Sequence, residues 1–224
     1  MTAHPALPET LPLFPIRGCI LLPGEALPLN VFEPRYLNMV DDAMAGNGFI
    51  GMIQPRETGP RDRPDLERVG TAGRIAKYSE TEDGRYLIVL IGLSRFALTG
   101  EAHLKTPYRA GRADYSGFEA DIAGPVADEA GADRAGFLSL VKAFFIQTGI
   151  EADWDSMAHA PLSAITNKVA MAAPFDAASR QALLQAGRAS VRRELLATLM
   201  RGALEQPVRD PFSGQAGRPQ GRLH

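Results

Sequence analysis

The segment LFPIRGCILLPGEALPLNVFEPRYLNMV, residues 13–40, places four prolines and two glycines in an otherwise mostly apolar stretch. Proline lacks a backbone N–H and glycine permits sharp turns, so neither one long helix nor one uninterrupted strand can span this segment. The segment is also too apolar for a surface loop. We therefore expect short strands separated by a turn at Pro23-Gly24, followed by a helix that starts at Pro34.

Strand-like patterns dominate up to about residue 116. Two long runs flank Asp83-Gly84, the residue pair that a tight hairpin turn favours. Within the second run, YLIVLIG (86–92) is apolar at every position, which predicts a central strand buried on both faces. Shorter runs bounded by proline or glycine predict further strands at 10–16, 26–32, 48–54 and 108–116.

The remaining periodicity is helical, first in the short segment after Pro34 and then from about residue 131 to 204. Gly46 is placed to end the first helix, and Asp176 and Gly187 are placed to begin and end a later one. Apolar side chains repeat at helical spacing in four groups. These groups are Tyr36, Leu37, Val40 and Met44; Phe137, Val141, Phe144 and Phe145; Leu162, Ile165 and Val169; and Val191, Leu195, Leu196, Leu199 and Met200.

Composition limits the classes of protein that the chain can belong to. Apolar residues make up 45% and charged residues 22% of the 224 residues, which is the ordinary globular range. A net charge of −2 argues against a nucleic-acid binder held by bulk electrostatics. The single cysteine, Cys19, fits a reducing cytoplasm, and neither a signal peptide nor a membrane span is recognisable in the sequence.

Several short motifs fit catalytic or cofactor patterns without the context that the chemistry needs. Residues 46–51 match G-x-G-x-x-G, but a helix precedes them and a strand follows, the reverse of a dinucleotide site. Ser139 and Lys142 match S-x-x-K without the other motifs of a serine acyl-enzyme, so a solvated helix face is favoured. The acidic group EADWD, 151–155, favours helix capping over a cation site. The sequence predicts no metal, no cofactor and no ATP-binding P-loop.

The opening segment resembles the start of the N-terminal, substrate-binding domain of Lon proteases. That family begins with a Leu-Pro-Leu-x-Pro-Leu-Arg type strand, then a Pro-Gly turn, then a Pro-Leu strand that runs into a helix. The similarity extends over about residues 10–204, whereas the ATPase and peptidase domains of the protease have no counterpart. The segments that carry it are 11–17, 21–24, 28–36, 69–71, 82–98 with Gly92 and Arg95-Phe96, and 174–185.

The resemblance implies an α+β fold in which a PUA-like, six-stranded β-barrel with one packed helix precedes an α-helical bundle. It agrees with the order of strand and helix patterns in the sequence. We accordingly expect a flexible start, a β-barrel subdomain, a connector, a helical bundle subdomain and a disordered tail. Their predicted bounds are 1–9, 10–116, 117–130, 131–204 and 205–224.

The function implied by the resemblance is a non-catalytic polypeptide-binding module that captures unfolded or tagged proteins. The alternative is a regulatory adaptor that docks on a protein partner, and a third reading is a serine hydrolase built on Ser139 and Lys142. Leu22, Phe32, Tyr36 and Tyr78 are candidate polypeptide-binding residues, although such side chains usually lie in a core. Arg17, Glu33, Arg35 and Arg95 are candidates either for an anion site or for a structural ion network.

Overall fold

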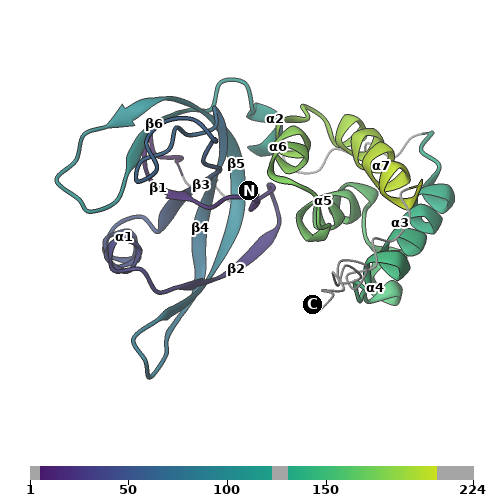
Figure 1. Cartoon of the computed structure of the whole chain (residues 1–224), viewed down its shortest axis with the longest axis horizontal. Coiled ribbons are helices and arrows are strands. Elements are labelled where there is room, and N and C mark those ends of the chain that lie inside the picture. The colour runs from purple at the N-terminus through teal and green to yellow at the C-terminus, as the bar shows by residue number, and fades with distance from the viewer. Residues whose placement is uncertain (1–5, 123–130, 206–224) are drawn as a thin grey trace, which may run out of the picture.

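The computed structural model describes residues 6–122 and 131–205. The strands and one helix form one half of the molecule, and the later helices form the other (Figure 1). This order confirms the predicted α+β class. The predicted tail from 206 onward, the first five residues and 123–130 of the predicted connector lie outside the described residues.

Six strands form one mixed sheet with the order β2-β5-β4-β3-β1-β6. An additional pairing between β5 and β6 joins β5, β4, β3, β1 and β6 into a closed ring, and β2 pairs with β5 beside that ring. Only β1 and β3 run parallel. The PUA-like barrel remains a prediction. The strands are Thr10–Pro15 (β1), Ala26–Val31 (β2), Phe49–Ile53 (β3), Val69–Glu80 (β4), Tyr86–Ala102 (β5) and Ala110–Asp114 (β6).

The long strand β5 carries β2 and β6 on the same edge. Residues 86–91 pair with β2 and residues 97–102 pair with β6, while β4 occupies the opposite edge. Gly92 lies between the two partners, where its N–H donates to Glu25 O at 3.0 Å and its carbonyl accepts from Gly24 N at 2.9 Å. The start of β2 is thereby fixed to the middle of β5.

The predicted turn at Pro23-Gly24 is present. The N–H of Glu25 donates to Leu22 O at 3.1 Å, and Gly24 has φ of +81°. A positive φ at the third position, after proline at the second, defines a type II turn and favours glycine there. The turn reverses the chain so that β2 can pair with β5.

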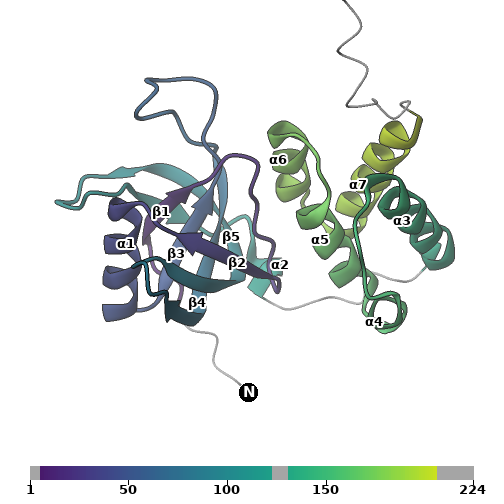
Figure 2. The same ribbon diagram turned by 60° about the horizontal axis from the view of Figure 1, so that its bottom comes forward.

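Helix α1, Pro34–Ala45, packs on the side of the strands that faces away from the helical half (Figure 2). It begins at Pro34 and is capped by Gly46, as predicted. Its buried face is formed by Tyr36, Met39, Val40 and Ala43. Met44, which we expected in the apolar stripe, is half-exposed because the contact with the strands follows Met39 and Ala43 instead.

The helical half buries the two predicted stripes on α3 and α5. Asp176 caps α6 as predicted, and the helix ends at Gln185 with Ala186 as its C-cap, one residue before Gly187. The helices are Glu119–Ile122 (α2), Arg134–Thr148 (α3), Trp154–His159 (α4), Leu162–Ala172 (α5), Ala177–Gln185 (α6) and Ala189–Glu205 (α7).

The last predicted stripe is partly wrong. Val191 is 49% exposed, whereas Arg192, Leu196 and Met200 are buried. An arginine therefore occupies the first position of the inward-facing row. Its guanidinium donates hydrogen bonds to the carbonyls of Leu183 and Ala186 and to Asn167. The buried charge is therefore hydrogen-bonded.

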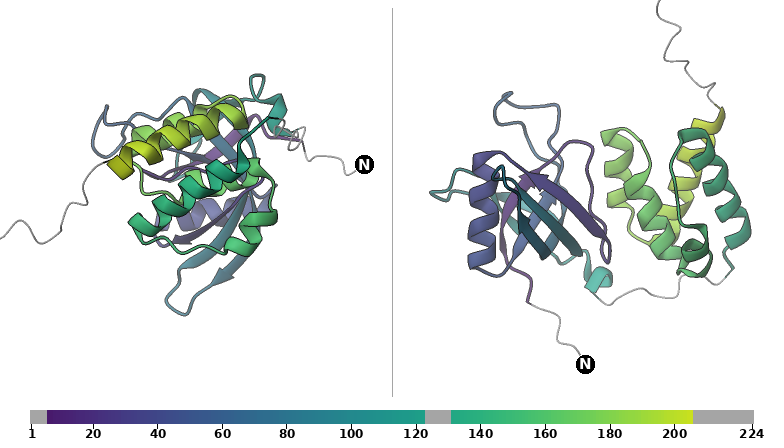
Figure 3. Two further views of the ribbon diagram at one scale, coloured as in Figure 1. Left: turned by 90° about the vertical axis from the view of Figure 1, so that its right-hand side faces the viewer. Right: turned by 90° about the horizontal axis from the view of Figure 1, so that it is seen from below.

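The two halves share a core. Helices α5 and α6 lie nearest the strands, and α3 and α7 lie farther away (Figure 3). Ile20 and Leu22, from the loop before the Pro23-Gly24 turn, belong to the same buried cluster as the phenylalanines of α3. The N-terminal segment thus supplies part of the core of the helical half, which makes the two halves one packed unit.

Among the residues described, no helix combines the length and the apolar character that crossing a membrane requires.

Candidate functional site

The structure separates the four predicted polypeptide-binding residues into a buried pair and an exposed pair. Leu22 is fully buried against the helical half, and Tyr36 is buried against Phe14 with ring centroids 4.5 Å apart. Phe32 is 64% exposed and Tyr78 is 40% exposed. Of these four residues, Phe32 and Tyr78 are therefore the two that offer apolar surface to a partner.

Tyr78 borders an open groove of about 540 Å³ on β2, β5 and β4, but it pairs with Ile88 and its ring packs on Tyr86, on the opposite face of the sheet from Leu87. Strand register places Pro28, Val89 and Lys77 in one row and Asn30, Leu87 and Ser79 in the next. Each row crosses the three strands and contains one β5 side chain, so the groove has an apolar middle with more polar sides.

Leu87 is a groove residue that the sequence reasoning missed. The apolar run 86–92 predicted burial on both faces, and that prediction is wrong for its first half. Ile88 and Leu90 face the core, whereas Leu87 is 45% exposed. Its exposure arises because the hairpin of β4 and β5 extends beyond the rest of the sheet, where no helix covers its second face (Figure 1).

The outer edge of the groove is formed by β2, which pairs with β5 alone. A free strand edge can recruit another extended chain through backbone hydrogen bonds. Pro28 lies in the middle of β2 and has no N–H, which weakens such pairing. The side chains of the groove are therefore better placed than the edge backbone to hold a ligand.

The four predicted charged residues are not brought together. Arg17 pairs with Glu57 on the surface, and Arg35 pairs with its neighbour Glu33 at 2.8 Å, also on the surface. Arg95 is 3% exposed and binds neither of these glutamates. The predicted network of Glu33 with several arginines does not exist.

Arg95 instead joins the two halves of the molecule. Its Nε and Nη2 donate to the two carboxylate oxygens of Asp121 at 2.8 Å each. Its Nη1 donates to the carbonyls of Leu184 at 3.1 Å and Ala186 at 2.7 Å, at the C-terminal end of α6. Asp121 lies in the predicted connector, and no sequence pattern indicated that it pairs with β5. This arginine is structural.

A second arginine reinforces the same junction. Arg192 also donates to Ala186 O, at 3.2 Å, and its Nη1 donates to Asn167, whose amide donates to Pro23 O at 3.3 Å. Burial, and after it the nearby charge of Arg95, lower the pKa of Arg192 to about 10. Cations suit the carbonyl end of a helix, where the macrodipole is negative.

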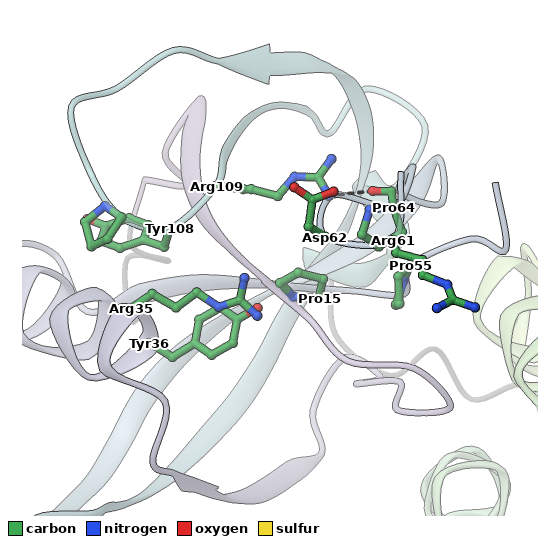
Figure 4. Close-up of a pocket in the computed structure, with 10 residues that line it drawn as sticks. Pro15, Arg35, Tyr36, Pro55, Arg61, Asp62, Pro64, Tyr108 and Arg109 are labelled. Atoms are coloured by element: carbon green, nitrogen blue, oxygen red, sulfur yellow. Dashed lines mark hydrogen bonds between the residues drawn. The ribbon is translucent and has the colours of Figure 1, made fainter. Parts of the chain in front are cut away.

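A small cleft of about 200 Å³ lies at the N-terminal end of α1 (Figure 4). Arg35 and Tyr36 form one side, Arg109 and Pro64 the opposite side, and Pro15 the floor between them. The Arg35 guanidinium lies 4.6 Å from the centre of the Tyr36 ring. In Figure 4 the Arg61 side chain points away from Arg35. The guanidinium groups of Arg35 and Arg109 thus lie on opposite sides of the cleft, whose lining also contains tyrosine and proline side chains.

Arg109 is fixed by a charged network. It pairs with Glu101 through two nitrogens and donates from Nη1 to Pro64 O at 2.6 Å. Arg63 also donates to Glu101, at 2.8 Å. The hydrogen bond from Arg109 is the main reason that the pKa of Glu101 falls to about 2.

The depressed pKa of Glu101 predicts a pH dependence of stability. A carboxyl group whose pKa is lower when folded stabilises the fold above its unfolded pKa, about 4.3, and loses this contribution as the pH falls through the folded value. We expect Glu101→Gln to unfold at lower urea concentration than the wild type at pH 7 and at an equal concentration near pH 2. A constant difference at both pH values would contradict the pairing.

The other residues that the sequence suggested for a site either have a structural role or do not gather with other candidate residues. Asp153 caps α4 by accepting from Ser156 N at 3.0 Å, as the helix-capping interpretation predicted. Ser139 and Lys142 are exposed on α3. Burial raises the pKa of the Cys19 thiol, although Arg180 acts in the opposite direction. Across residues 6–122 and 131–205 no three His, Cys, Asp or Glu side chains gather as metal ligands.

Comparison with known families explains the combination of a six-stranded sheet and a helical half. The substrate-binding domain of ATP-dependent protease La (LON) matches residues 10–202, nearly the whole of the chain. The chain belongs to the Lon substrate-binding domain family. The resemblance noted in the sequence is thereby confirmed.

The similarity to whole Lon proteases is confined to one domain. Lon protease 4 of Sorangium cellulosum is 37% identical over 101 residues, which are 44% of this chain and 12% of that protein. Lon protease of Flavobacterium johnsoniae is 30% identical over 104 residues, 46% of this chain and 13% of that protein. The chain therefore covers only a small part of the curated relatives, and the part that it covers is the substrate-binding domain and not a catalytic one.

Solved Lon N-terminal domains share the fold. A Lon N-terminal domain protein from Xanthomonas campestris aligns with a TM-score of 0.57 and 23% identity over 84% of this chain and 97% of that one. The N-terminal domain of Mycobacterium avium complex Lon protease aligns with a TM-score of 0.61 and 17% identity over 86% of this chain and 98% of that one. Both alignments span the strand and helical halves together.

Proposed function

We propose that this Lon-family domain binds unfolded polypeptide segments in the groove on β2, β5 and β4. The observation that carries the proposal is the exposed Leu87 side chain near the end of the β4–β5 hairpin, which keeps 45% of its surface in solvent and stands on the same face of the sheet as Pro28 and Val89. The family's substrate-binding role supports the same function.

The shape of the groove favours an extended segment. Its rows of side chains run across three strands, and its apolar middle can cover a few consecutive apolar side chains of a partner. Burying one leucine-sized side chain gives about 1.5–3 kcal/mol. Folded proteins hide such side chains in their cores, whereas unfolded chains expose them, so the groove discriminates in favour of unfolded clients.

Leu87→Asp is expected to weaken binding of a labelled, permanently unfolded polypeptide by at least about tenfold, since it places a charge in the middle of the groove and removes about 1.4 kcal/mol or more of apolar contact. Fluorescence anisotropy titration of the full-length protein measures the dissociation constant. The folded counterpart of the polypeptide is expected to bind neither form.

Val191→Asp provides a matched control for Leu87→Asp. Val191 is 49% exposed, almost the same fraction as Leu87, but lies on α7 in the helical half. The control is expected to bind as the wild type does. Equal weakening by both substitutions would contradict the assignment of the groove.

The adaptor interpretation rests on one observation in the helical half. Ile146 on α3 is the most exposed large apolar side chain among the described residues, at 74%. If Ile146→Asp, and not Leu87→Asp, abolishes binding, the partner docks on the helices. Deleting residues 131–224 would not separate the two functions, because it would expose Ile20 and Leu22.

The serine hydrolase reading has less support. Ser139 and Lys142 lie on the solvent side of α3 and neither lines a cleft or groove described above. Ser139→Ala is therefore expected to leave every measured property of the protein unchanged.

A further inference from the structure

The cleft at the start of α1 lies on the same chain segment as the groove. Residues 28–30 line the groove, Phe32 follows with its exposed ring, and Arg35 and Tyr36 line the cleft. The segment 28–36 therefore contributes to an apolar surface and to a cationic one.

The cleft has guanidinium donors to spare. Arginine has five N–H donors in a planar fork. The contacts that Arg109 makes with Glu101 and Pro64 engage three of them, which leaves one on each terminal nitrogen. Arg35 is held by Glu33 through Nε and Nη2, which leaves both donors of Nη1.

The existing partner of Arg35 is easily displaced. The side chains of Arg35 and Glu33 are 48% and 45% exposed, and a surface pair of this kind contributes at most about 1 kcal/mol. Glu33 also makes no side-chain capping bond to α1, and the first turn of the helix contains no acidic residue. Glu33, the N-cap residue, is thus the acidic group at the positive end of the helix dipole beside Arg35.

The charged residues that line the cleft are mostly cationic. They are Arg35, Arg61 and Arg109, with Asp62 as the carboxylate among them.

We propose that this cleft binds a carboxylate of the polypeptide held in the groove, with Arg35 and Arg109 as the donors. A carboxylate is planar and accepts from a guanidinium fork through both oxygens. The volume of about 200 Å³ admits one small acidic group. The inference rests on the proposed polypeptide binding and adds to it a preference for acidic segments or free C-termini.

The test uses three labelled peptides of one apolar, unfolded sequence. The first ends in a free carboxylate, the second in an amide, and the third is the amide with one internal aspartate. Wild-type protein is expected to bind the amide about tenfold more weakly than the free acid. If the aspartate peptide recovers the affinity, the cleft accepts side chains as well as C-termini, and if it does not, the cleft is specific for C-termini.

Arg35→Ala is expected to erase the difference between acid and amide and to leave the affinity for the amide unchanged. Arg17→Ala is the matched control, because Arg17 is also an exposed arginine paired with a surface glutamate but lies outside the cleft and the groove. If the wild-type protein binds the acid and the amide equally well, the carboxylate site is overturned. It is also overturned if Arg35→Ala loses affinity for both peptides.

A second measurement separates this inference from the function on which it rests. Sodium acetate is titrated into the full-length protein while the Arg35 and Arg109 Nε–H resonances are followed by NMR, with sodium chloride at equal ionic strength as the reference. Shifts specific to acetate support the cleft even where no peptide binds. Their absence, together with peptide binding that ignores the terminal charge, leaves the groove in place and removes the cleft.

Discussion

Arg95→Ala is expected to lower the free energy of unfolding by about 3–5 kcal/mol, the range for breaking a buried ion pair by removing one partner. The Asp121 side chain is only 9% exposed and would keep its negative charge with no cation beside it. The carbonyls of Leu184 and Ala186 would lose a donor at the same time. Urea denaturation followed by circular dichroism measures the change.

Two further variants test whether the unpaired charge of Asp121 causes this loss of stability. Arg95→Lys should recover little of the stability, because an ammonium group cannot reach two carboxylate oxygens and the α6 carbonyls together. The double variant Arg95→Met with Asp121→Leu should be more stable than Arg95→Ala, since it leaves no buried charge unpaired.

Arg85→Ala is the control for removal of an arginine in general. Arg85 pairs with Asp83 at the tip of the β4–β5 hairpin, and both side chains are at least half exposed. Its loss should cost no more than about 1 kcal/mol. If Arg95→Ala costs as little as Arg85→Ala, Arg95 does not hold the two halves together.

The elements of the fold could be predicted where the signal is local. Pro34 at a helix start, Asp83-Gly84 between two strands and Asp176 before α6 each act on residues within one turn of themselves, and the structure has each in its predicted place. Local backbone chemistry decides such boundaries, so one sequence is enough to find them.

Burial could not be predicted in the same way, because it depends on which distant segments meet. Leu22 and Phe32 look alike as apolar residues near prolines, yet α3 and α5 cover the first and nothing described covers the second. Leu87 belongs to an apolar run that predicts burial, yet it is exposed to solvent because the sheet is narrower at that end. Of the residues around the groove the sequence reasoning named Tyr78, whose ring lies on the other face of the sheet with Tyr86, and it missed Leu87.

The charged contacts were the least predictable. Arg95 and Asp121 are 26 residues apart, and Arg192 belongs to a buried row of α7 that is otherwise apolar. No sequence pattern indicates either the Arg95–Asp121 pair or the burial of Arg192, because both follow from how the helical half docks on β5. The cleft likewise joins Arg35 to Arg109, of which the sequence suggested only the first.

Gly92→Ala is expected to lower stability by about 3 kcal/mol, at the upper end of the usual cost of overpacking. A Cβ at Gly92 would lie 2.4 Å from Leu22 O and 3.0 Å from the Leu21 side chain. The carbonyl cannot move away freely, since the turn that holds it is bonded to Gly92 itself through Gly24 and Glu25.

The thermal midpoint provides the measurement for Gly92→Ala. A loss of about 3 kcal/mol corresponds to a fall of about 6–12 °C for a chain of this size. Gly100→Ala is the matched control, because Gly100 lies in the same strand, β5, and a Cβ there would meet nothing within 4 Å. An equal midpoint for both variants would mean that the turn before β2 yields to the added methyl group, and that β2 is not fixed to the middle of β5.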